Sequence, residues 1–211
     1  IFKKHKNSYF ISIGKFGKIL KLLNKKKCKK VLFAGKIEKP KIKNLKFDIK
    51  GVYYLPRIIK SFKLGDAAIL KELINILAEN NIKVINSNLF NSELTLKRGI
   101  YTKIKPVKNT LTQIKSGIKS FQKLNAYDHT QAIIVEQDGS IHKETTKGTK
   151  KMLQSIAAKE DDYRILIKFP KKKQDLRADL PTIGLDTLKD CKKAKLKGIV
   201  LKANQNIFLE Q

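Results

Sequence analysis

The chain has 211 residues, 41% of them hydrophobic, which is enough for one large domain or two small ones with buried cores. Its 47 basic and 18 acidic residues give a formal net charge of +29. Such a charge is typical of nucleic-acid-binding proteins. However, only four of the basic residues are arginine, and the lysines are spread over the whole sequence. We therefore interpret the charge as a residue bias and expect no nucleic-acid partner; a basic nucleic-acid-binding protein is the alternative that charge alone supports.

Cysteine usage and apolar runs limit the class of protein further. Cys28 and Cys191 lie far apart and form no CxxC pair, which argues against a disulfide framework or a zinc site and fits a reducing cytosol. No apolar run reaches the roughly 18 residues that cross a bilayer, and no signal peptide is visible. We expect a cytoplasmic protein.

The first half of the chain alternates short apolar runs with helical periodicity. Residues 9–13, 31–35 and 82–85 predict buried strands. Helices are predicted after a glycine turn at residues 14–18, over 52–62, and over 66–80 with Asp66 as the N-cap. The turn fits a phosphate-binding loop poorly, so we interpret it as a plain strand–helix turn. The alternation predicts a Rossmann-like α/β domain with a parallel sheet over residues 1–104.

A polar connector at residues 97–109 marks the predicted boundary to a second domain over 105–211. Asp138-Gly139 between residues 131–136 and 140–144 is a strong hairpin signal. The other predicted strands are 164–169, 199–201 and 207–209, and the predicted helices are 111–124, 148–158 and one from Asp186, as N-cap, to Leu196. This order predicts a mixed-sheet α/β domain, so the fold class is α/β with two α/β domains.

The stretch from 166 to 184, LIKFPKKKQDLRADLPTIG, carries the chemistry. Pro181 disfavours a helix before it, so we expect an extended segment with Asp175, Arg177 and Asp179 on one side. A helix would also bring the two aspartates together, at i,i+4. Basic side chains suit phosphate oxygens, and carboxylates suit a divalent metal or the activation of water. The plainer interpretation is that these acids only pair with neighbouring Lys and Arg.

The spacing K-x-x-K-x-x-Q-D-x-R-x-D-x-P-x-x-G resembles the signature of the LpxI-type UDP-2,3-diacylglucosamine pyrophosphatases. It is met by Lys168, Lys171, Gln174, Asp175, Arg177, Asp179, Pro181 and Gly184. Further residues follow the family's order along most of the chain: Ala34-Gly35, Pro40, Asp48, Gly65-Asp66, Gly117, Asp128, Gln131, Glu144, Gly148-Thr149 and Met152-Leu153.

The chain departs from the family at several points. Lys147, Lys150, Ala67 and Lys202 stand where the family usually has acids. The sequence begins at Ile1, and the family's glycine-rich opening and C-terminal tail are absent, so we expect a chain trimmed at both ends with an incomplete N-terminal domain. The replaced acids keep open a non-catalytic relative that binds a sugar nucleotide or a phospholipid head group.

The resemblance implies an enzyme of lipid A biosynthesis that hydrolyses UDP-2,3-diacylglucosamine to UMP and 2,3-diacylglucosamine 1-phosphate. It implies Mg²⁺ or another divalent cation and a substrate bound between the two domains. It is also compatible with peripheral contact at the inner membrane and with a homo-oligomer. The predicted catalytic residues are Lys168, Lys171, Asp175, Arg177 and Asp179, of which Asp175 and Asp179 are the predicted metal ligands. The predicted substrate-binding residues are Gln131, Gly148, Thr149 and Gln174.

Overall fold

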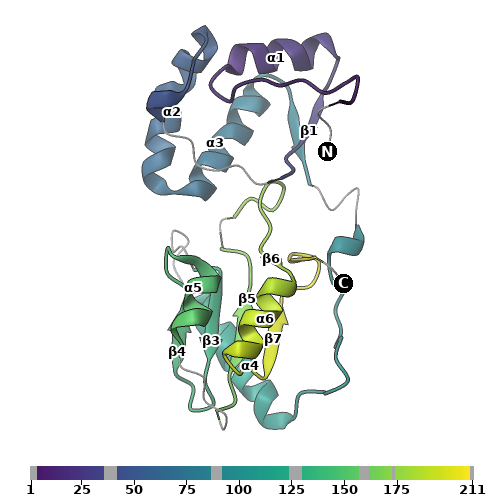
Figure 1. Ribbon diagram of the computed structural model, residues 1–211, viewed down its shortest axis with the longest axis vertical. Helices are drawn as coiled ribbons and strands as arrows, with labels where there is room; N and C mark the ends of the chain where they lie inside the picture. Colours follow the sequence, from purple (N-terminus) through teal and green to yellow (C-terminus); the bar gives the residue numbers. More distant parts are fainter. Residues whose placement is uncertain are drawn as a thin grey trace. The chain divides into compact units, whose positions relative to one another are not determined.

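The structure is a computed structural model, and it describes residues 4–35, 42–86, 92–123, 130–156, 162–172 and 174–209. The chain divides into two compact units, Ile1–Ser87 and Asn88–Gln211 (Figure 1). Both units combine helices and strands, which confirms the predicted class of two α/β domains. The boundary between residues 104 and 105 stays a prediction. Pro40 and Asp128, which carry part of the family resemblance, lie outside the described residues.

The N-terminal unit contains a parallel pair of strands connected through helices. Its elements in chain order are α1 (Phe16–Lys25), β1 (Lys30–Leu32), η1 (Ile42–Asn44), α2 (Ile49–Leu64), α3 (Asp66–Glu79) and β2 (Lys83–Ile85). β1 and β2 run parallel with Val31 opposite Val84, as the predicted βαβ pattern requires. The core gathers buried side chains from α1, α3 and β2: Leu20, Ile74, Ile76, Leu77, Ile82 and Val84.

Two predictions in this unit are wrong. Residues 9–13 form no strand, and the side chain of Phe10 is fully exposed. A short apolar run becomes a strand only where a neighbouring strand accepts its backbone hydrogen bonds, and none of the described strands pairs with it. The N-cap of α3 is Gly65 rather than Asp66. Asp66 is the first helical residue, where its carboxylate favours the positive end of the helix dipole.

One carboxylate joins the beginnings of two helices. Asp48 is the N-cap of α2, and its Oδ1 accepts the N–H of Gly51 at 2.9 Å. The same carboxylate accepts the N–H of Gly17 at 3.1 Å and of Lys18 at 2.9 Å, in the first turn of α1. The anion at the start of α1 is therefore the protein's own side chain, which supports a structural role for the glycine turn. A Cβ on Gly51 would lie 2.1 Å from the carbonyl oxygen of Gly14, so only glycine fits there.

The C-terminal unit is built on a four-stranded sheet. Its elements are η3 (Ser92–Leu94), α4 (Lys108–Gln122), β3 (Ala132–Val135), β4 (Ile141–Lys143), α5 (Gly148–Ser155), β5 (Ile165–Lys168), β6 (Thr182–Ile183), α6 (Leu185–Lys193), β7 (Gly198–Leu201) and β8 (Ile207–Phe208). The strand order is β4-β3-β5-β7. β3 is antiparallel to β4 and to β5, whereas β5 and β7 are parallel, so the predicted mixed sheet and hairpin are confirmed.

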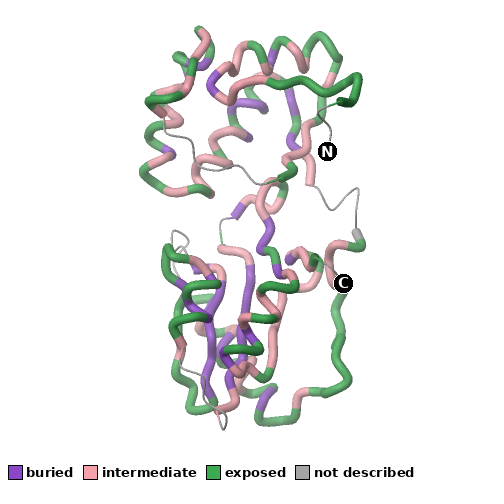
Figure 2. The backbone as a smooth tube through the Cα atoms, viewed as in Figure 1, coloured by how far each residue is buried: buried purple, intermediate pink, exposed green. Residues whose placement is uncertain are grey.

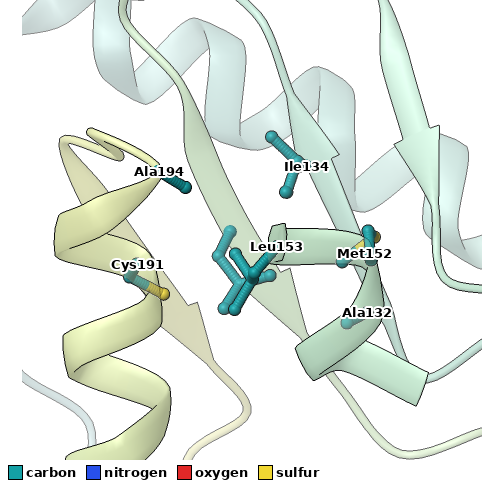
Figure 3. Close-up of a cluster of buried hydrophobic side chains, with 7 residues drawn as sticks. Ala132, Ile134, Met152, Leu153, Cys191 and Ala194 are labelled. Atoms are coloured by element: carbon teal, nitrogen blue, oxygen red, sulfur yellow. The ribbon is translucent and has the colours of Figure 1, made fainter. Parts of the chain in front are cut away.

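Both faces of this sheet are covered, and β3 and β5 are buried along their whole length. One face packs Ala132, Ile134 and Leu166 against α5 and α6 (Figure 3), through Met152, Leu153, Cys191 and Ala194. The other face packs Ile133, Val135, Ile165 and Ile167 against Phe121 of α4 and against Phe169. Figure 2 shows the buried residues concentrated along these strands. The sheet thus fixes the end of β5, where the predicted site begins.

The segment after β5 is held by a second, two-stranded sheet. β6 pairs in parallel with β8, and the N–H of Ile207 donates to the carbonyl of Pro181 at 2.9 Å. The N-cap of α6 is Gly184, not Asp186 as predicted; Asp186 lies in the first turn. None of the helices in the described ranges has the length and hydropathy that crossing a bilayer requires.

We predict that Asp48→Asn lowers the free energy of unfolding of the N-terminal unit by about 1–2 kcal/mol, because asparagine keeps one acceptor oxygen but loses the negative charge and places an NH2 group where Oδ2 accepts the N–H of Lys18. Burial raises the pKa of Asp48, but the hydrogen bonds from the N–H groups of Gly51, Gly17 and Lys18 lower it by more. The net result is a pKa below the ordinary 3.8. This stabilisation is therefore present above pH 3.8 and is lost as the pH falls toward the lower folded pKa. Urea unfolding of wild type and variant between pH 7 and pH 3 measures it.

The matched control is Asp186→Asn, which removes an exposed first-turn carboxylate that caps no helix. Its cost should be a few tenths of a kcal/mol. Equal destabilisation by the two variants would show that the shared cap at Asp48 has no special role.

Candidate active site

The site begins with a buried ammonium group at the end of β5. Lys168 is only 8% exposed, and its Nζ donates to Oγ1 of Thr149 at 3.1 Å. Burial lowers the pKa of Lys168, while the charge of Glu144 raises it. Burial also raises the pKa of the Cys191 thiol to about 12, with a further contribution from Asp190. The cation therefore depends on Glu144 for its charge compensation.

Glu144 is the centre of a buried hydrogen-bond network. Its Oε1 accepts from Oγ1 of Thr149, and its Oε2 accepts from the backbone N–H of Gln131, both at 2.7 Å. Its backbone carbonyl accepts from Oγ1 of Thr130 at 3.0 Å. Both carboxylate oxygens thus have donors, and the network joins the end of β4, the start of α5 and the residue before β3. These hydrogen bonds therefore connect Lys168, at the end of β5, with β4, α5 and the start of β3.

The start of α5 has the backbone that this network needs. Gly148 has φ +84°, in the left-handed region that favours glycine, and it opens α5 directly before Thr149. Gly148 and Thr149 were predicted to bind substrate. The structure places Thr149 between Lys168 and Glu144, where its hydroxyl both accepts and donates.

Gln174 links the loop after β5 to the sheet. Its Oε1 accepts from Nε2 of Gln131 and from the backbone N–H of Lys171, both at 2.9 Å. Its Nε2 donates to the carbonyl of Asp179 at 3.2 Å. Gln174 is buried, so this side chain, predicted to bind substrate, also holds the two ends of the 171–179 loop together.

Within that loop, Asp175 and Arg177 form a bidentate ion pair. Nε of Arg177 donates to Oδ1 of Asp175 at 2.9 Å and Nη2 donates to Oδ2 at 2.6 Å. The guanidinium is nearly half exposed. The hydrogen bond and charge of Asp175 raise the pKa of Arg177. The plainer interpretation of the motif, acids paired with neighbouring bases, therefore holds for this pair.

The predicted extended backbone of this loop is wrong. The N–H groups of Ala178 and Asp179 both donate to the carbonyl of Asp175 at 3.1 Å, which makes a helical turn. The alternative i,i+4 relation of Asp175 and Asp179 is the one observed. Pro181 ends the turn and begins the extended course into β6, so its effect reaches fewer residues than the sequence suggested.

The predicted residues thus fall into two sets within one loop region. Lys168, Thr149, Gln131 and Gln174 share the buried network, whereas Asp175 and Arg177 pair at the surface of the loop, and Gln174 connects the two. Lys171 is half-buried. Lys173 lies outside the described residues.

Three side chains of the network, those of Thr130, Glu144 and Asn206, were not among the predicted site residues. Glu144 was noted only as a match to the family's order. Asn206 donates from Nδ2 to the carbonyl of Lys168 at 3.0 Å and accepts the N–H of Lys202 at 2.8 Å. Apart from that match, Glu144 is only an acid at the end of a predicted strand, and Asn206, between two predicted strands, carries no sequence signal.

A hollow of about 770 Å³ lies elsewhere in this unit, between β4 and α5. Its walls include Lys143, Lys147 and Lys151 around an apolar floor of Ile141, Met152 and Ile156. Lys168, Asp175 and Asp179 do not line it. Lys147 and Lys150, which replace family acids, are exposed at the start of α5, so both replacements leave the buried network intact.

Asp175 and Asp179 are the residues that would hold a Mg²⁺ ion in this loop, because carboxylates are hard oxygen ligands of the kind that Mg²⁺ takes, typically one or two beside substrate phosphates. Among the described residues, no three His, Cys, Asp or Glu side chains gather into a metal site.

We predict that Glu144→Gln lowers the free energy of unfolding by about 3 kcal/mol at pH 7, because it leaves the buried Lys168 ammonium without a counter-charge. Lys168 binds its proton less tightly in the folded chain, so stability rises with pH between its folded pKa and the ordinary 10.5. In the variant the pKa of Lys168 falls further, and this rise should begin at a lower pH. Urea unfolding from pH 7 to 10.5 measures both effects.

Thr149 offers a matched pair of controls. Thr149→Ser keeps the hydroxyl between Lys168 and Glu144, whereas Thr149→Val keeps the shape and removes it. The valine variant should lose about 1–3 kcal/mol more than the serine variant. Equal stability of the two would show that the hydroxyl does not connect the buried charges.

Comparison with known proteins covers both units. Residues 2–94 match the LpxI N-terminal domain, and residues 97–211 match the LpxI C-terminal domain. A relative from Caulobacter vibrioides, described as UDP-2,3-diacylglucosamine pyrophosphatase LpxI, is 29% identical over 209 residues, which cover 95% of this chain and 75% of the relative. The matches to both domains, in order and over nearly the whole chain, show that this protein belongs to the LpxI family.

Proposed function

We propose that this chain hydrolyses the pyrophosphate bond of UDP-2,3-diacylglucosamine, releasing UMP and 2,3-diacylglucosamine 1-phosphate. The relative from Caulobacter vibrioides is named for pyrophosphatase action on this substrate. The observation that carries the proposal is the loop 168–184. It follows the inner strand β5 directly, and the Gln131–Gln174 hydrogen bond joins it to the network around Glu144 and Lys168. Clefts outside the carboxyl ends of strands are where α/β enzymes usually bind ligands.

The cations of the loop would serve the pyrophosphate. Arg177 presents a planar fork at the surface, which fits two phosphate oxygens as well as it fits Asp175. When phosphate takes the guanidinium, the Asp175 carboxylate is released. Lys171 lies three residues beyond Lys168 and would add charge near the leaving UMP. Lys168 contributes a fixed positive charge while its ammonium holds Thr149.

The carboxylates would serve the water and the metal. One of Asp175 and Asp179 would hold a divalent cation, Mg²⁺ in the simplest case, and the other would orient or deprotonate the attacking water. When bound, such an ion neutralises phosphate charge and polarises the phosphorus–oxygen bond. The helical turn spaces the two aspartates at i and i+4 along the backbone, a spacing that would suit both roles.

The substrate is amphiphilic, so we propose a cytoplasmic enzyme with peripheral contact at the inner membrane. A second candidate is a relative that binds the sugar nucleotide without hydrolysing it. The exposed cations Lys147 and Lys150, at the start of the helix that carries Thr149, favour binding of anions there.

We predict that Asp175→Asn with Asp179→Asn lowers kcat/KM for UMP release by at least about a hundredfold, the typical contribution of a positioned acid–base group. The assay uses Mg²⁺ and detergent-dispersed UDP-2,3-diacylglucosamine, with Asp186→Asn as the control of equal chemistry outside the loop. Full activity in the double variant would refute the assignment. A wild type that binds the substrate but releases no UMP would favour the second candidate.

A further inference from the structure

Helix α2 exposes a continuous apolar face, which we call the α2 stripe and define by Ile49, Val52, Tyr53, Pro56 and Ile59. The positions follow a spacing of i, i+3, i+4, i+7 and i+10, so they lie on one side of the helix. Ile49 is 90% exposed and Tyr53 is 72% exposed. Figure 2 shows exposed and buried residues alternating along this helix. Apolar side chains so exposed at regular spacing indicate an interaction surface.

The opposite side of α2 is fully used by its own unit. Gly51, Tyr54 and Ser61 are buried. Arg57 bonds both carboxylate oxygens of Glu79, at 2.6 and 2.9 Å, and contacts Glu72 at 2.6 Å, which fastens α2 to α3. The α2 stripe is therefore not needed to hold the helix in place.

Lysines continue the stripe toward the end of the helix. Lys60 and Lys63 share its side of the helix, at i+11 and i+14 from Ile49. They line a shallow hollow of about 550 Å³ together with Val52, Pro56 and Ile59. α2 contains four basic residues and no acid. Glu72 and Glu79 of α3 both pair with Arg57. These two acids are therefore engaged by Arg57, and the exposed Lys60 and Lys63 keep their charges at the surface.

The α2 stripe with its lysines combines positive charge and exposed apolar area, and this combination indicates which kind of partner fits it. A second copy meeting this face through the same stripe would bring a second set of lysines and repel it. Nucleic acid would satisfy the lysines but leave the aliphatic side chains uncovered. A helix with lysine beside exposed apolar and aromatic side chains fits the headgroup region of an anionic bilayer, where apolar groups insert and lysines meet lipid phosphates.

We propose that the α2 stripe, with Lys60 and Lys63, docks the protein on an anionic phospholipid bilayer, lying in the plane of the headgroups. Docking at this face rests on the proposed function, since a diacylated substrate would be reached from the membrane surface.

The direct test is co-sedimentation of the full chain with vesicles of phosphatidylcholine, with and without 30% phosphatidylglycerol. Wild type should bind the anionic vesicles, and binding should weaken as salt rises. Lys60→Gln with Lys63→Gln should lower the partition coefficient about twenty-fivefold, since each lysine near the surface contributes about fivefold. Val52→Ser with Tyr53→Ser should lower it at least about tenfold by removing insertable area.

Matched controls come from an exposed segment outside α2. Lys103→Gln with Lys105→Gln removes the same charge, and Ile104→Ser removes an apolar side chain that is 82% exposed. These variants should bind vesicles nearly as wild type does. Equal loss in the controls would show that net charge, not the α2 stripe, drives binding and would overturn the proposal.

Other outcomes also decide the matter. Wild type that fails to bind anionic vesicles overturns the proposal, and so does α2-variant binding equal to wild type. A change of oligomeric state in the α2 variants, by light scattering, without vesicle binding assigns the stripe to a second copy. UMP release from detergent-dispersed substrate should be unchanged in the α2 variants. Hydrolysis without vesicle binding refutes docking alone, and vesicle binding without hydrolysis refutes the proposed function alone.

Discussion

The C-terminal unit depends on how one ammonium group is kept charged inside it. Moving a lysine from water into a protein interior is costly unless an acid and hydrogen-bond partners accompany it. Lys168 has the hydroxyl of Thr149 as its acceptor, and that hydroxyl in turn donates to Glu144. Because both carboxylate oxygens of Glu144 are used, this arrangement fixes the ends of β4 and β5 and the first turn of α5 relative to one another.

The same constraint extends to the loop that carries the proposed chemistry. The backbone N–H of Gln131 donates to the carboxylate of Glu144, and the side-chain amide of Gln131 donates to Gln174. Gln174 then closes the loop between Lys171 and Asp179. The polar side chains nearest the sheet are thus engaged with one another, while Arg177 reaches solvent. A substrate phosphate would contact a loop whose two ends are held by the hydrogen bonds of Gln174. Its outer cation, Arg177, could exchange Asp175 for the phosphate.

Sequence patterns predicted most of the elements, because the signals were local. The hairpin at Asp138-Gly139, the buried strand β5 and the helices α2 and α3 follow from turn chemistry and periodicity. The strand at residues 9–13 was wrong because pairing is not a local property. Asp66 and Asp186 were misplaced as caps by one and two residues, since a glycine, Gly65 with a positive φ and Gly184 with an extended backbone, is the N-cap of each of those helices. The shape of the 175–179 turn could not be derived, because Gln174 sets it through contacts with distant residues.

In a chain with this lysine bias, the few acids carry more structural information than the many bases. Asp48 joins the starts of α1 and α2, Glu79 and Glu72 fasten α2 to α3 through Arg57, and Glu144 compensates Lys168. An exposed lysine costs little and so accumulates without a role, whereas an acid persists where a cation or a row of N–H groups needs it. The lysines of α2 are informative for a different reason. They continue an exposed apolar stripe on a helix without acids, and that conjunction, unlike the net charge, is a local property that a bilayer can recognise.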